Sequence, residues 1–327
     1  MSASLCGAPA LRVAFVAGLG RSGSTLLDRI LGQVPGCVNV GEASQVWRAL
    51  SGGVPCGCGL PARQCPFWSV VIPQVLGSWS PEKLAEALRL QRRVDRLRYL
   101  PALMLPVRFG RRNRDVRSYA ELLTALYAAV AHTTGAAIVV DSGKHTSTAY
   151  LLRHVPGIDL RVIHLVRDPR GVAYSWTKVV RKSDHAGAPE MPRQEPTRVA
   201  RRWLIHNVLL SILSLLDVPR HFLRYEDLVA APRDRVIEVG RFLGMDADAS
   251  RMPFLSDRVV DLRRTDHTLA GNPMRFQHDA ITVALDEQWR TSLPVGRRRV
   301  VTVMTAPLLR AFGYQIWPSR ATPGEHR

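Results

Sequence analysis

The sequence predicts an α/β protein with a doubly wound, mainly parallel sheet flanked by helices, because short apolar runs alternate with helical segments. The apolar runs that predict buried strands are 13–17, 136–140, 160–166 and 221–223. Each of the first three leads into a turn with glycine or polar residues and then into a helical segment. Ligands of such sheets bind beyond the carboxyl ends of the strands. The polar residues that follow these runs are therefore the candidate site.

Longer segments with helical start signals lie between and after the strands. They cover 24–33, 81–99, 118–133, 196–216, 232–243 and 295–312. Two stretches are predicted to be irregular: 52–66, and 182–196, which is rich in proline, glycine and charge and is expected to be a mobile loop. The length of 327 residues suits one large domain, 1–327, with a cysteine-containing and basic helical insertion at about 52–117.

The chain is strongly basic, with 45 Lys and Arg against 27 Asp and Glu and a net charge of +18. Such an excess indicates an anionic partner or an arginine-rich surface. Nucleic-acid binding is disfavoured, since we find no basic strand studded with aromatic residues and no reading helix. The apolar run 203–218 contains His206, Asn207 and Asp217, so no transmembrane segment is expected, while peripheral membrane contact through 89–117 stays open. A cytoplasmic location is expected.

The cysteines gather in one part of the chain. Of five, four lie between Cys37 and Cys65, and three of these form Cys56-Gly-Cys58 and the later Cys65. A four-cysteine zinc site needs two spaced pairs, so we expect no metal. Free thiols, or one local disulfide that closes the loop from Cys58 to Cys65, fit better. The odd count argues against the disulfide framework of a secreted protein.

A glycine-containing loop, Gly18-Leu19-Gly20-Arg21-Ser22-Gly23-Ser24-Thr25, follows the first strand and begins a helix. It matches the dinucleotide pattern G-x-G-x-x-G, with Glu42 about where a ribose-binding acid falls, and it nearly matches a P-loop. Both patterns direct free helical N–H groups at an anion. An arginine and three hydroxyls add donors for phosphate or sulfate. The candidate ligands are Gly20, Arg21, Ser22, Gly23, Ser24 and Thr25. An enzyme that uses NAD(P) or ATP stays an alternative.

A second loop of this kind covers residues 165–176. Arg167 lies at the tip of a predicted strand, and Ser175 follows two helical turns later, so both are candidates for one phosphate. Asp168 is expected to cap the helix, and with Arg170 to lie at the surface. Two anion sites at the ends of neighbouring strands suit a bisphosphorylated nucleotide. Neither a dinucleotide-binding fold nor a P-loop nucleotide hydrolase requires the second site.

These two loops resemble those of the sulfotransferases that use 3′-phosphoadenosine 5′-phosphosulfate (PAPS). The stretch from Arg21 to Leu27 is similar to their 5′-phosphosulfate loop, in the form with arginine found in protein-tyrosine sulfotransferases and many bacterial members. Arg167 and Ser175 match the pair that binds the 3′-phosphate. The resemblance implies a P-loop-like sulfotransferase fold. It also implies PAPS as donor, transfer to a hydroxyl or amine acceptor with release of adenosine 3′,5′-bisphosphate (PAP), and no metal.

The resemblance extends to the other polar residues. The D-S-G-K stretch that ends at Lys144 resembles one in bacterial members, which implies that this lysine stabilises charge on the departing nucleotide. Glu42 resembles the glutamate base of the tyrosylprotein enzymes, with His145 and His267 as alternative bases. Arg275 lies in a segment similar to the family's C-terminal nucleotide cover and is a candidate phosphate ligand. The acceptor, whether small molecule, glycan, lipid or protein tyrosine, is left open.

Overall fold

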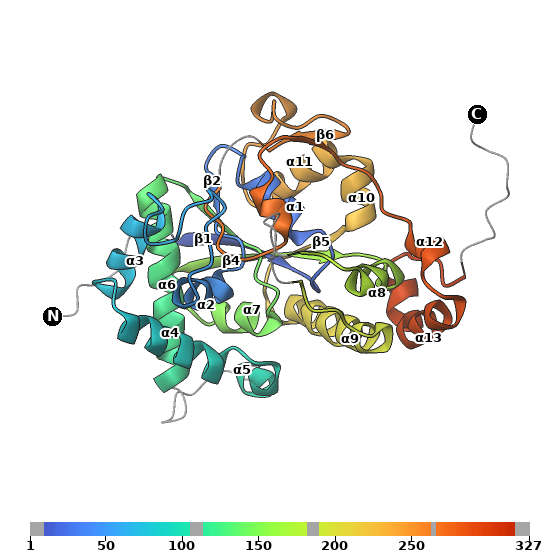
Figure 1. Ribbon diagram of the computed structural model, residues 1–327, viewed down its shortest axis with the longest axis horizontal. Helices are drawn as coiled ribbons and strands as arrows, with labels where there is room; N and C mark the ends of the chain where they lie inside the picture. Colours follow the sequence, from blue (N-terminus) through green and yellow to red (C-terminus); the bar gives the residue numbers. More distant parts are fainter. Residues whose placement is uncertain (1–9, 105–113, 182–189, 263–265, 318–327) are drawn as a thin grey trace.

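A five-stranded parallel sheet forms the centre of the computed structural model, which describes residues 10–104, 114–181, 190–262 and 266–317 (Figure 1). Its strands are β1 (Leu11–Ala17), β2 (Cys37–Asn39), β3 (Ile138–Asp141), β4 (Ile158–Val166) and β5 (Arg220–Arg224). The strand order is β2-β3-β1-β4-β5, with parallel pairing throughout. The chain therefore winds from β1 to one side and then crosses to the other, which confirms the predicted doubly wound sheet.

The predicted helices are present, with ends that differ by a few residues. They are α1 (Ser24–Leu31), α4 (Pro81–Val94), α6 (Arg114–Thr134), α9 (Pro196–Leu213), α11 (Pro232–Phe242) and α13 (Val295–Ala311). Two helices were predicted to be longer than they are. At their predicted C-terminal ends the chain forms the 3₁₀ turns η2 (Leu97–Tyr99) and η4 (Ser214–Leu216). Strand β2 is not predicted by the sequence, because three residues are too few to produce a periodic signal.

Shorter elements complete the fold. The helices are α2 (Val46–Ser51), α3 (Trp68–Leu76), α5 (Leu100–Met104), α7 (Thr146–Leu152), α8 (Pro169–Thr177), α10 (Tyr225–Ala230) and α12 (Trp289–Ser292). The 3₁₀ turns are η1 (Ala43–Gln45), η5 (Ala249–Arg251) and η6 (Pro273–Phe276). A small antiparallel pair joins β6 (Val259–Asp261) to β7 (Ala280–Thr282). Residues 105–113 of the predicted insertion and 182–189 of the predicted mobile loop lie outside the described residues.

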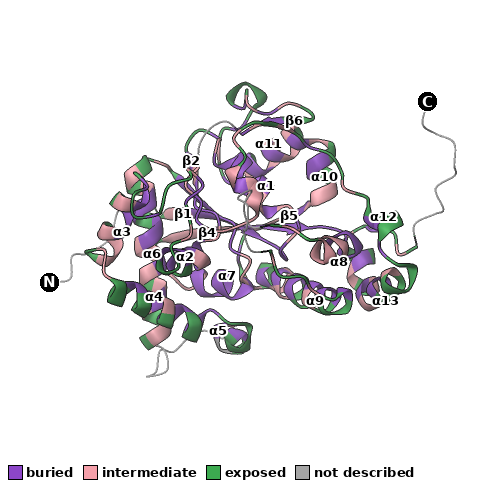
Figure 2. Ribbon diagram, in the orientation of Figure 1, coloured by how far each residue is buried: buried purple, intermediate pink, exposed green. Residues whose placement is uncertain are grey.

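Helices bury both faces of the sheet, which explains why its strands are continuous apolar runs. In β1, Val13 and Phe15 face a core shared with α2, α3, α4, α6 and α7, while Ala14 and Val16 face a core shared with α1 and α11. In Figure 1, α1, α10 and α11 lie above the sheet, and α2, α7 and α9 lie below it. Figure 2 shows the strands as the most buried part of the molecule.

One helical stretch among the described residues, Pro196–Leu216, has the length and apolar composition that a membrane span requires, although no such span was expected from the sequence. Of its apolar window, 39% is buried inside the protein. Its polar side chains bond within the fold, because His206 contacts Thr146 at 2.8 Å and Asn207 contacts His164 at 2.8 Å. A single helix of this kind is weak evidence for a membrane span.

A buried arginine of α1, Arg29, holds residues 266–274, which we call the C-terminal segment. Arg29 is 2% exposed, and its Nε donates to the Asp266 carboxylate at 2.7 Å. The other guanidinium nitrogens donate to the carbonyl oxygens of Met274 at 2.6 Å and Leu262 at 3.3 Å. A buried ion pair is tolerated when both charges keep their partners. Removal of one charge leaves the opposite charge buried without a partner, which is strongly destabilising. Arg29 therefore fixes residues 266–274 against α1.

We expect Arg29→Met to lower the free energy of unfolding by about 3–5 kcal/mol, the usual cost of breaking a buried ion pair. Arg93→Met is the matched control, because Arg93 pairs with Asp115 at 3.2 Å on the exposed surface. Such surface pairs contribute less than about 1 kcal/mol. Urea denaturation followed by circular dichroism measures both variants. Equal losses in the two would contradict the role given to Arg29.

Candidate active site

The loop between β1 and α1 presents unused N–H groups at the carboxyl edge of the sheet. Helix α1 begins at Ser24 after Gly23, with no side-chain cap and no acidic residue in its first turn. Its N-terminal N–H groups and the positive end of its dipole are thus free of a competing carboxylate. An anion such as phosphate binds well at this kind of helix start.

The backbone of this loop requires a glycine at one position and is strained at another. Gly23 has φ +90°, and a Cβ there would lie 2.5 Å from the ring of Tyr225. Arg21 has φ 77°, a left-handed conformation that is unfavourable for residues with a Cβ. Strain of this kind persists where the surroundings fix it, often at functional sites. Here it fixes the direction in which Arg21 leaves the loop.

Side chains from α8 and from the segment before α9 surround Arg21. Its guanidinium lies 5.4 Å from the ring centre of Trp176 and donates to the sulfur of Met191 at 3.2 Å. Trp176 in turn donates from Nε1 to the Gly20 carbonyl at 3.0 Å, which ties the loop to α8. Partial burial lowers the pKa of Arg21. An anionic ligand would compensate this desolvated cation.

The second loop, between β4 and α8, offers side chains in place of a free helix end. Asp168 caps α8 as predicted, since its carboxylate accepts from the Arg170 N–H at 2.8 Å. It also pairs with the Arg170 guanidinium at 2.6 Å. Both residues are buried, at 6% and 3% exposure, so their predicted surface position is wrong. Because the cap occupies the helix start, an anion here depends on Arg167 and Ser175.

The two loops touch each other through Arg167. Its Nη1 donates to the carbonyl oxygen of Arg21 at 3.2 Å, and its guanidinium lies 4.6 Å from the ring centre of Tyr225. Asp286 balances part of the charge, with a carboxylate oxygen 3.4 Å from Nη2. Strands β1 and β4 are neighbours in the sheet, so the loops that follow them meet at the point where the winding reverses.

One cavity of about 330 Å³ connects both loops. Of the predicted site residues, those that line it are Gly20, Arg21, Gly23, Ser24, Thr25, Glu42, Lys144, Arg167 and Ser175. Lining residues that the sequence analysis did not propose for the site are Leu26, Trp176, Met191, Tyr225, Gly271, Asn272 and Met274. Tyr225 directly follows β5, so the rule that ligands bind beyond strand ends would have found it.

Two predicted ligands lie outside this cavity. Ser22 is 1% exposed and sits inside the loop, where its N–H donates to the Leu19 carbonyl at 3.2 Å. Arg275 is turned away toward the cysteine stretch. Its Nη1 donates to the carbonyl oxygens of Pro55 at 3.0 Å and Thr268 at 2.8 Å. Arg275 therefore joins two loops, which differs from the phosphate contact expected for it.

Glu42 and Lys144 form an ion pair at the cavity wall. They lie on the segments that follow β2 and β3, and one buried acid holds both segments. The carboxylate of Asp141 accepts from the N–H groups of Ala43 at 3.1 Å and Gly143 at 2.7 Å. It also accepts from a tyrosine hydroxyl of α6 at 2.6 Å. Burial raises the pKa of Asp141 to about 6. Asp141 thereby sets the positions of the candidate base and the candidate lysine.

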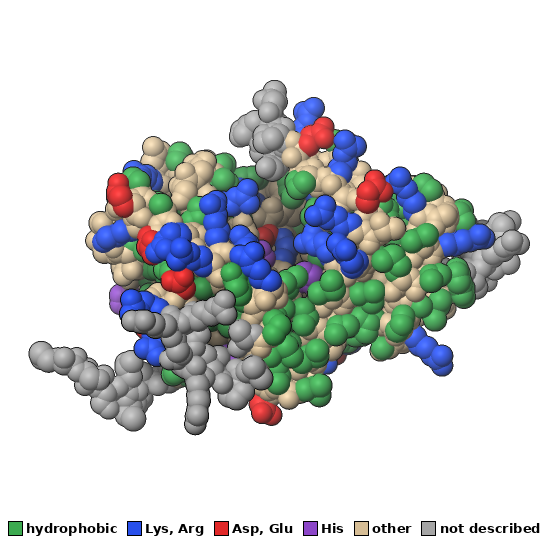
Figure 3. Space-filling model, turned by 90° about the horizontal axis from the view of Figure 1, so that it is seen from below, with side chains coloured by type: hydrophobic (Ala, Val, Ile, Leu, Met, Phe, Trp, Pro, Cys, Tyr) green, Lys and Arg blue, Asp and Glu red, His purple; other side chains and the backbone are tan. Residues whose placement is uncertain are grey.

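A second cavity, of about 320 Å³, adjoins the first. The residues common to both are Gly20, Glu42, Lys144 and Trp176. The second cavity is otherwise lined by Leu19, Asp95, Arg96, Leu97, His145, Ser147, Arg202 and His206. Figure 3 shows Lys and Arg side chains gathered around a hollow in one face of the molecule, with acidic and histidine side chains inside it. Two joined chambers suit a reaction between two bound molecules.

The two histidines proposed as alternative bases lie in different places. His145 lines the second cavity, with Nδ1 2.9 Å from a carboxylate oxygen of Asp95. Burial alone lowers the pKa of His145, but the bond to Asp95 outweighs it, so the net shift is upward. A raised pKa favours the protonated ring, which is a poor base. His267 lines neither of these cavities and faces Cys65 at 3.2 Å.

We expect Gly23→Ala to destabilise the protein more than Gly36→Ala. Both glycines have positive φ, which costs an L-residue about 1–2 kcal/mol. A Cβ at position 23 would also collide with Tyr225, whereas one at position 36 meets nothing within 4 Å. The collision should add about 1–3 kcal/mol, the usual cost of overpacking. Urea denaturation gives both values, and equal losses would show that Tyr225 yields freely.

Comparison with known proteins identifies relatives of this chain. A family model described as "Sulfotransferase family" matches residues 14–249, a range that includes both loops. Carbohydrate sulfotransferase 3 from Homo sapiens is 29% identical over 178 residues, which cover 49% of this chain and 35% of the human protein. The protein of that name from Tetronarce californica is 28% identical over 178 residues, covering 50% and 38%. The chain thus spans little more than a third of the curated relatives it matches.

Among solved structures, the sulfotransferase domain of the Synechococcus PCC 7002 olefin synthase is similar. The match has a TM-score of 0.51 and 22% sequence identity, and it covers 95% of this chain and 97% of that domain. A likeness at this identity concerns the fold. It agrees with the predicted P-loop-like arrangement, in which a parallel sheet carries its loops at one edge.

Proposed function

The chain belongs to the sulfotransferase family, and we propose that its two joined cavities transfer a sulfuryl group from PAPS to a hydroxyl of an acceptor, with release of PAP. One observation carries the proposal. The loop of Arg21 and the loop of Arg167 line a single cavity and are linked by a 3.2 Å hydrogen bond. A nucleotide with phosphates at its 5′ and 3′ positions needs two such anion sites at a short separation.

The 5′-phosphosulfate is assigned to the start of α1. There, free N–H groups, the guanidinium of Arg21 and the hydroxyls of Ser24 and Thr25 supply donors to an anion. The 3′-phosphate is assigned to Arg167 and Ser175, across the same cavity. NAD and ATP carry phosphates only at the 5′ position and have no need for this second arginine site, whereas NADP carries a 2′-phosphate and is therefore compared with PAP in the titration below. This favours PAPS over the alternatives that the glycine pattern alone left open.

In the proposed reaction, the acceptor oxygen attacks sulfur, and the bond from sulfur to the 5′-phosphate oxygen breaks. Negative charge grows on that phosphate oxygen, where Lys144 stabilises it. Glu42 takes the proton of the acceptor hydroxyl. The ion pair between Glu42 and Lys144 keeps both groups at the border of the two cavities. They are therefore within reach of donor and acceptor alike.

We assign the second cavity to the acceptor and propose that the acceptor is a carbohydrate hydroxyl. The relatives named carbohydrate sulfotransferase 3 support this class. So do side chains of the cavity wall, where Arg96 and Arg202 can donate hydrogen bonds to sugar hydroxyls and Trp176 offers a flat apolar surface. A panel of saccharides with PAPS, read by mass spectrometry, should yield sulfated sugars. Products formed only from phenols or lipids would overturn this choice.

Arg167→Ala should remove the preference of the protein for PAP over adenosine 5′-phosphate, which lacks the 3′-phosphate. Charge-assisted hydrogen bonds contribute about 1.5–3 kcal/mol, so the affinity for PAP should fall about 10- to 100-fold. The affinity for adenosine 5′-phosphate should change little, which makes it the internal control. Calorimetric titration measures both ligands, with NADP and ATP for comparison. Tighter binding of NADP or ATP than of PAP by the wild-type protein would contradict the proposed donor.

Glu42→Gln should lower kcat about 10²- to 10⁴-fold, the usual contribution of a general base. PAP affinity should stay nearly unchanged, because the amide keeps the shape of the side chain. His145→Asn is the comparison, since His145 lines the second cavity and is predicted to be protonated more readily. Release of PAP measures turnover with the best saccharide of the panel. A larger loss of kcat in His145→Asn would transfer the role of base to the histidine.

A further inference from the structure

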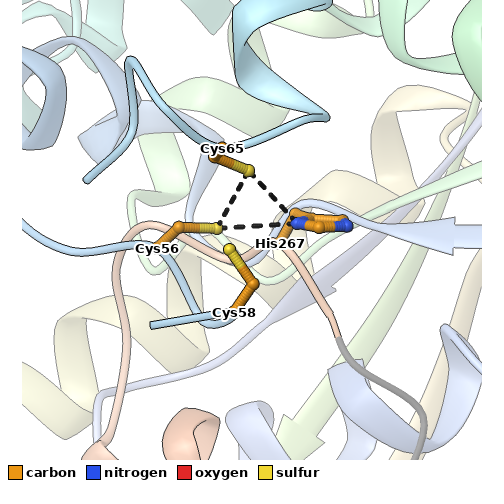
Figure 4. Close-up of side chains that lie close together, drawn as sticks. All are labelled: Cys56, Cys58, Cys65 and His267. Atoms are coloured by element: carbon orange, nitrogen blue, oxygen red, sulfur yellow. Dashed lines mark hydrogen bonds between the residues drawn. The ribbon is translucent and has the colours of Figure 1, made fainter. Parts of the chain in front are cut away.

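Three cysteines and one histidine converge outside both cavities (Figure 4). Cys56 and Cys58 come from the irregular stretch after α2, Cys65 precedes α3, and His267 comes from the segment between β6 and η6. Their four ligand atoms all lie within 4.8 Å of one another. The tertiary fold thus brings together potential metal ligands from distant parts of the sequence.

The spacing of the Cys56, Cys65 and His267 ligand atoms is close to that of a tetrahedral zinc site. The Cys56 and Cys65 sulfurs are 3.6 Å apart, and Nδ1 of His267 lies 3.7 Å from the first and 3.2 Å from the second. Zinc bonds of about 2.0–2.3 Å at tetrahedral angles separate neighbouring ligands by roughly 3.5–3.8 Å. Of the two alternatives that the sequence left open, free thiols or a disulfide between Cys58 and Cys65, the structure has the free thiols.

Two cysteines of the cluster are held in place by burial and by backbone hydrogen bonds, as the ligands of a preorganised metal site are. Cys56 and Cys65 are fully buried. Backbone bonds hold the stretch that carries them, since the N–H of Cys56 donates to the Leu60 carbonyl at 2.8 Å and that of Cys65 to the Pro61 carbonyl at 3.0 Å. These bonds fix the positions of the two cysteines.

The histidine is oriented by a separate set of contacts. The ring of His267 stacks on that of Phe67, with centres 5.1 Å apart and planes at 11°. The backbone carbonyl of His267 accepts from Nε1 of Trp68 at 2.6 Å. These contacts leave Nδ1 of His267 directed at the sulfurs, as Figure 4 shows.

We propose that Cys56, Cys58, Cys65 and His267 bind one structural Zn²⁺. Three thiolates and an imidazole form a donor set that zinc prefers, and four protein ligands leave no open position for catalysis. This revises the expectation of no metal drawn from the sequence. That expectation counted cysteine pairs only, and the fourth ligand lies 202 residues after Cys65.

The proposed zinc would join the cysteine stretch to the wall of the donor cavity. Residues Gly271, Asn272 and Met274, a few positions after His267, line that cavity. A backbone bond from Gly57 to the Thr268 carbonyl at 2.8 Å runs beside the cluster. Loss of zinc should therefore lower Tm and loosen this wall. The proposal does not depend on the reaction, because metal content is measured without turnover.

The direct test is the metal content of the full chain purified without metal-affinity resin. Elemental analysis by mass spectrometry should find one zinc per chain after dialysis against metal-free buffer. Replacement by Co²⁺ should produce the thiolate-to-cobalt charge-transfer band and the visible bands of a tetrahedral site. A protein that holds no zinc and takes up none when reduced would overturn the proposal, as would a disulfide between Cys56 and Cys65 in the metal-free purified protein.

Variants distinguish these ligands from other thiols. Cys58→Ser should speed the release of zinc to a chromophoric chelator by at least about tenfold, because even loss of an outer-shell partner weakens zinc binding that much. Cys58→His keeps a zinc ligand and should restore retention. Cys37→Ser is the control, since that buried thiol contacts Met245 at 3.6 Å and is outside the cluster. Equal zinc release from Cys58→Ser and Cys37→Ser would exclude the site.

Discussion

The parallel pairing of β1 with β4 is the constraint on which the site depends. Their register runs from Leu11 opposite Ile158 to Ala17 opposite His164, so both strands end at the same edge. After β1 the chain continues to strands on one side of this pair, and after β4 it continues to β5 on the other side. The loops that follow β1 and β4 therefore diverge and leave a crevice between them. The contact between Arg167 and the carbonyl of Arg21 closes the crevice into one cavity. Both candidate anion sites thus arise from one feature of the sheet.

The C-terminal segment completes this cavity, and several independent contacts hold it there. Arg29 binds it from within α1, and the N–H of Asn272 donates to the Thr25 hydroxyl at 3.4 Å. Arg275 and the cysteine–histidine cluster attach it to the stretch after α2. These anchors surround a segment with little regular structure of its own. Under the proposed function, donor binding in such a cavity depends on side chains far from the phosphates.

The fold could be predicted from the sequence because the patterns that mark its strands and helices are local in the chain. Continuous apolar runs mark strands buried on both faces, and proline marks where α4, α8, α9 and α11 begin. Strand ends are local features too, so Arg21, Lys144 and Arg167 were all predicted near one edge of the sheet, and they line one cavity. The strands β2, β6 and β7 were not predicted, since three residues carry no period.

The sequence by itself determined the order of strands and helices, the glycine loop and the pair of strand-end arginines. Tertiary structure decided which side chains meet. It turned Arg275 toward Pro55, brought Tyr225 into the cavity wall and set His267 beside Cys65. The physical reason is that periodicity reports which face of an element is apolar, whereas contacts between distant loops follow from the packing of the whole chain.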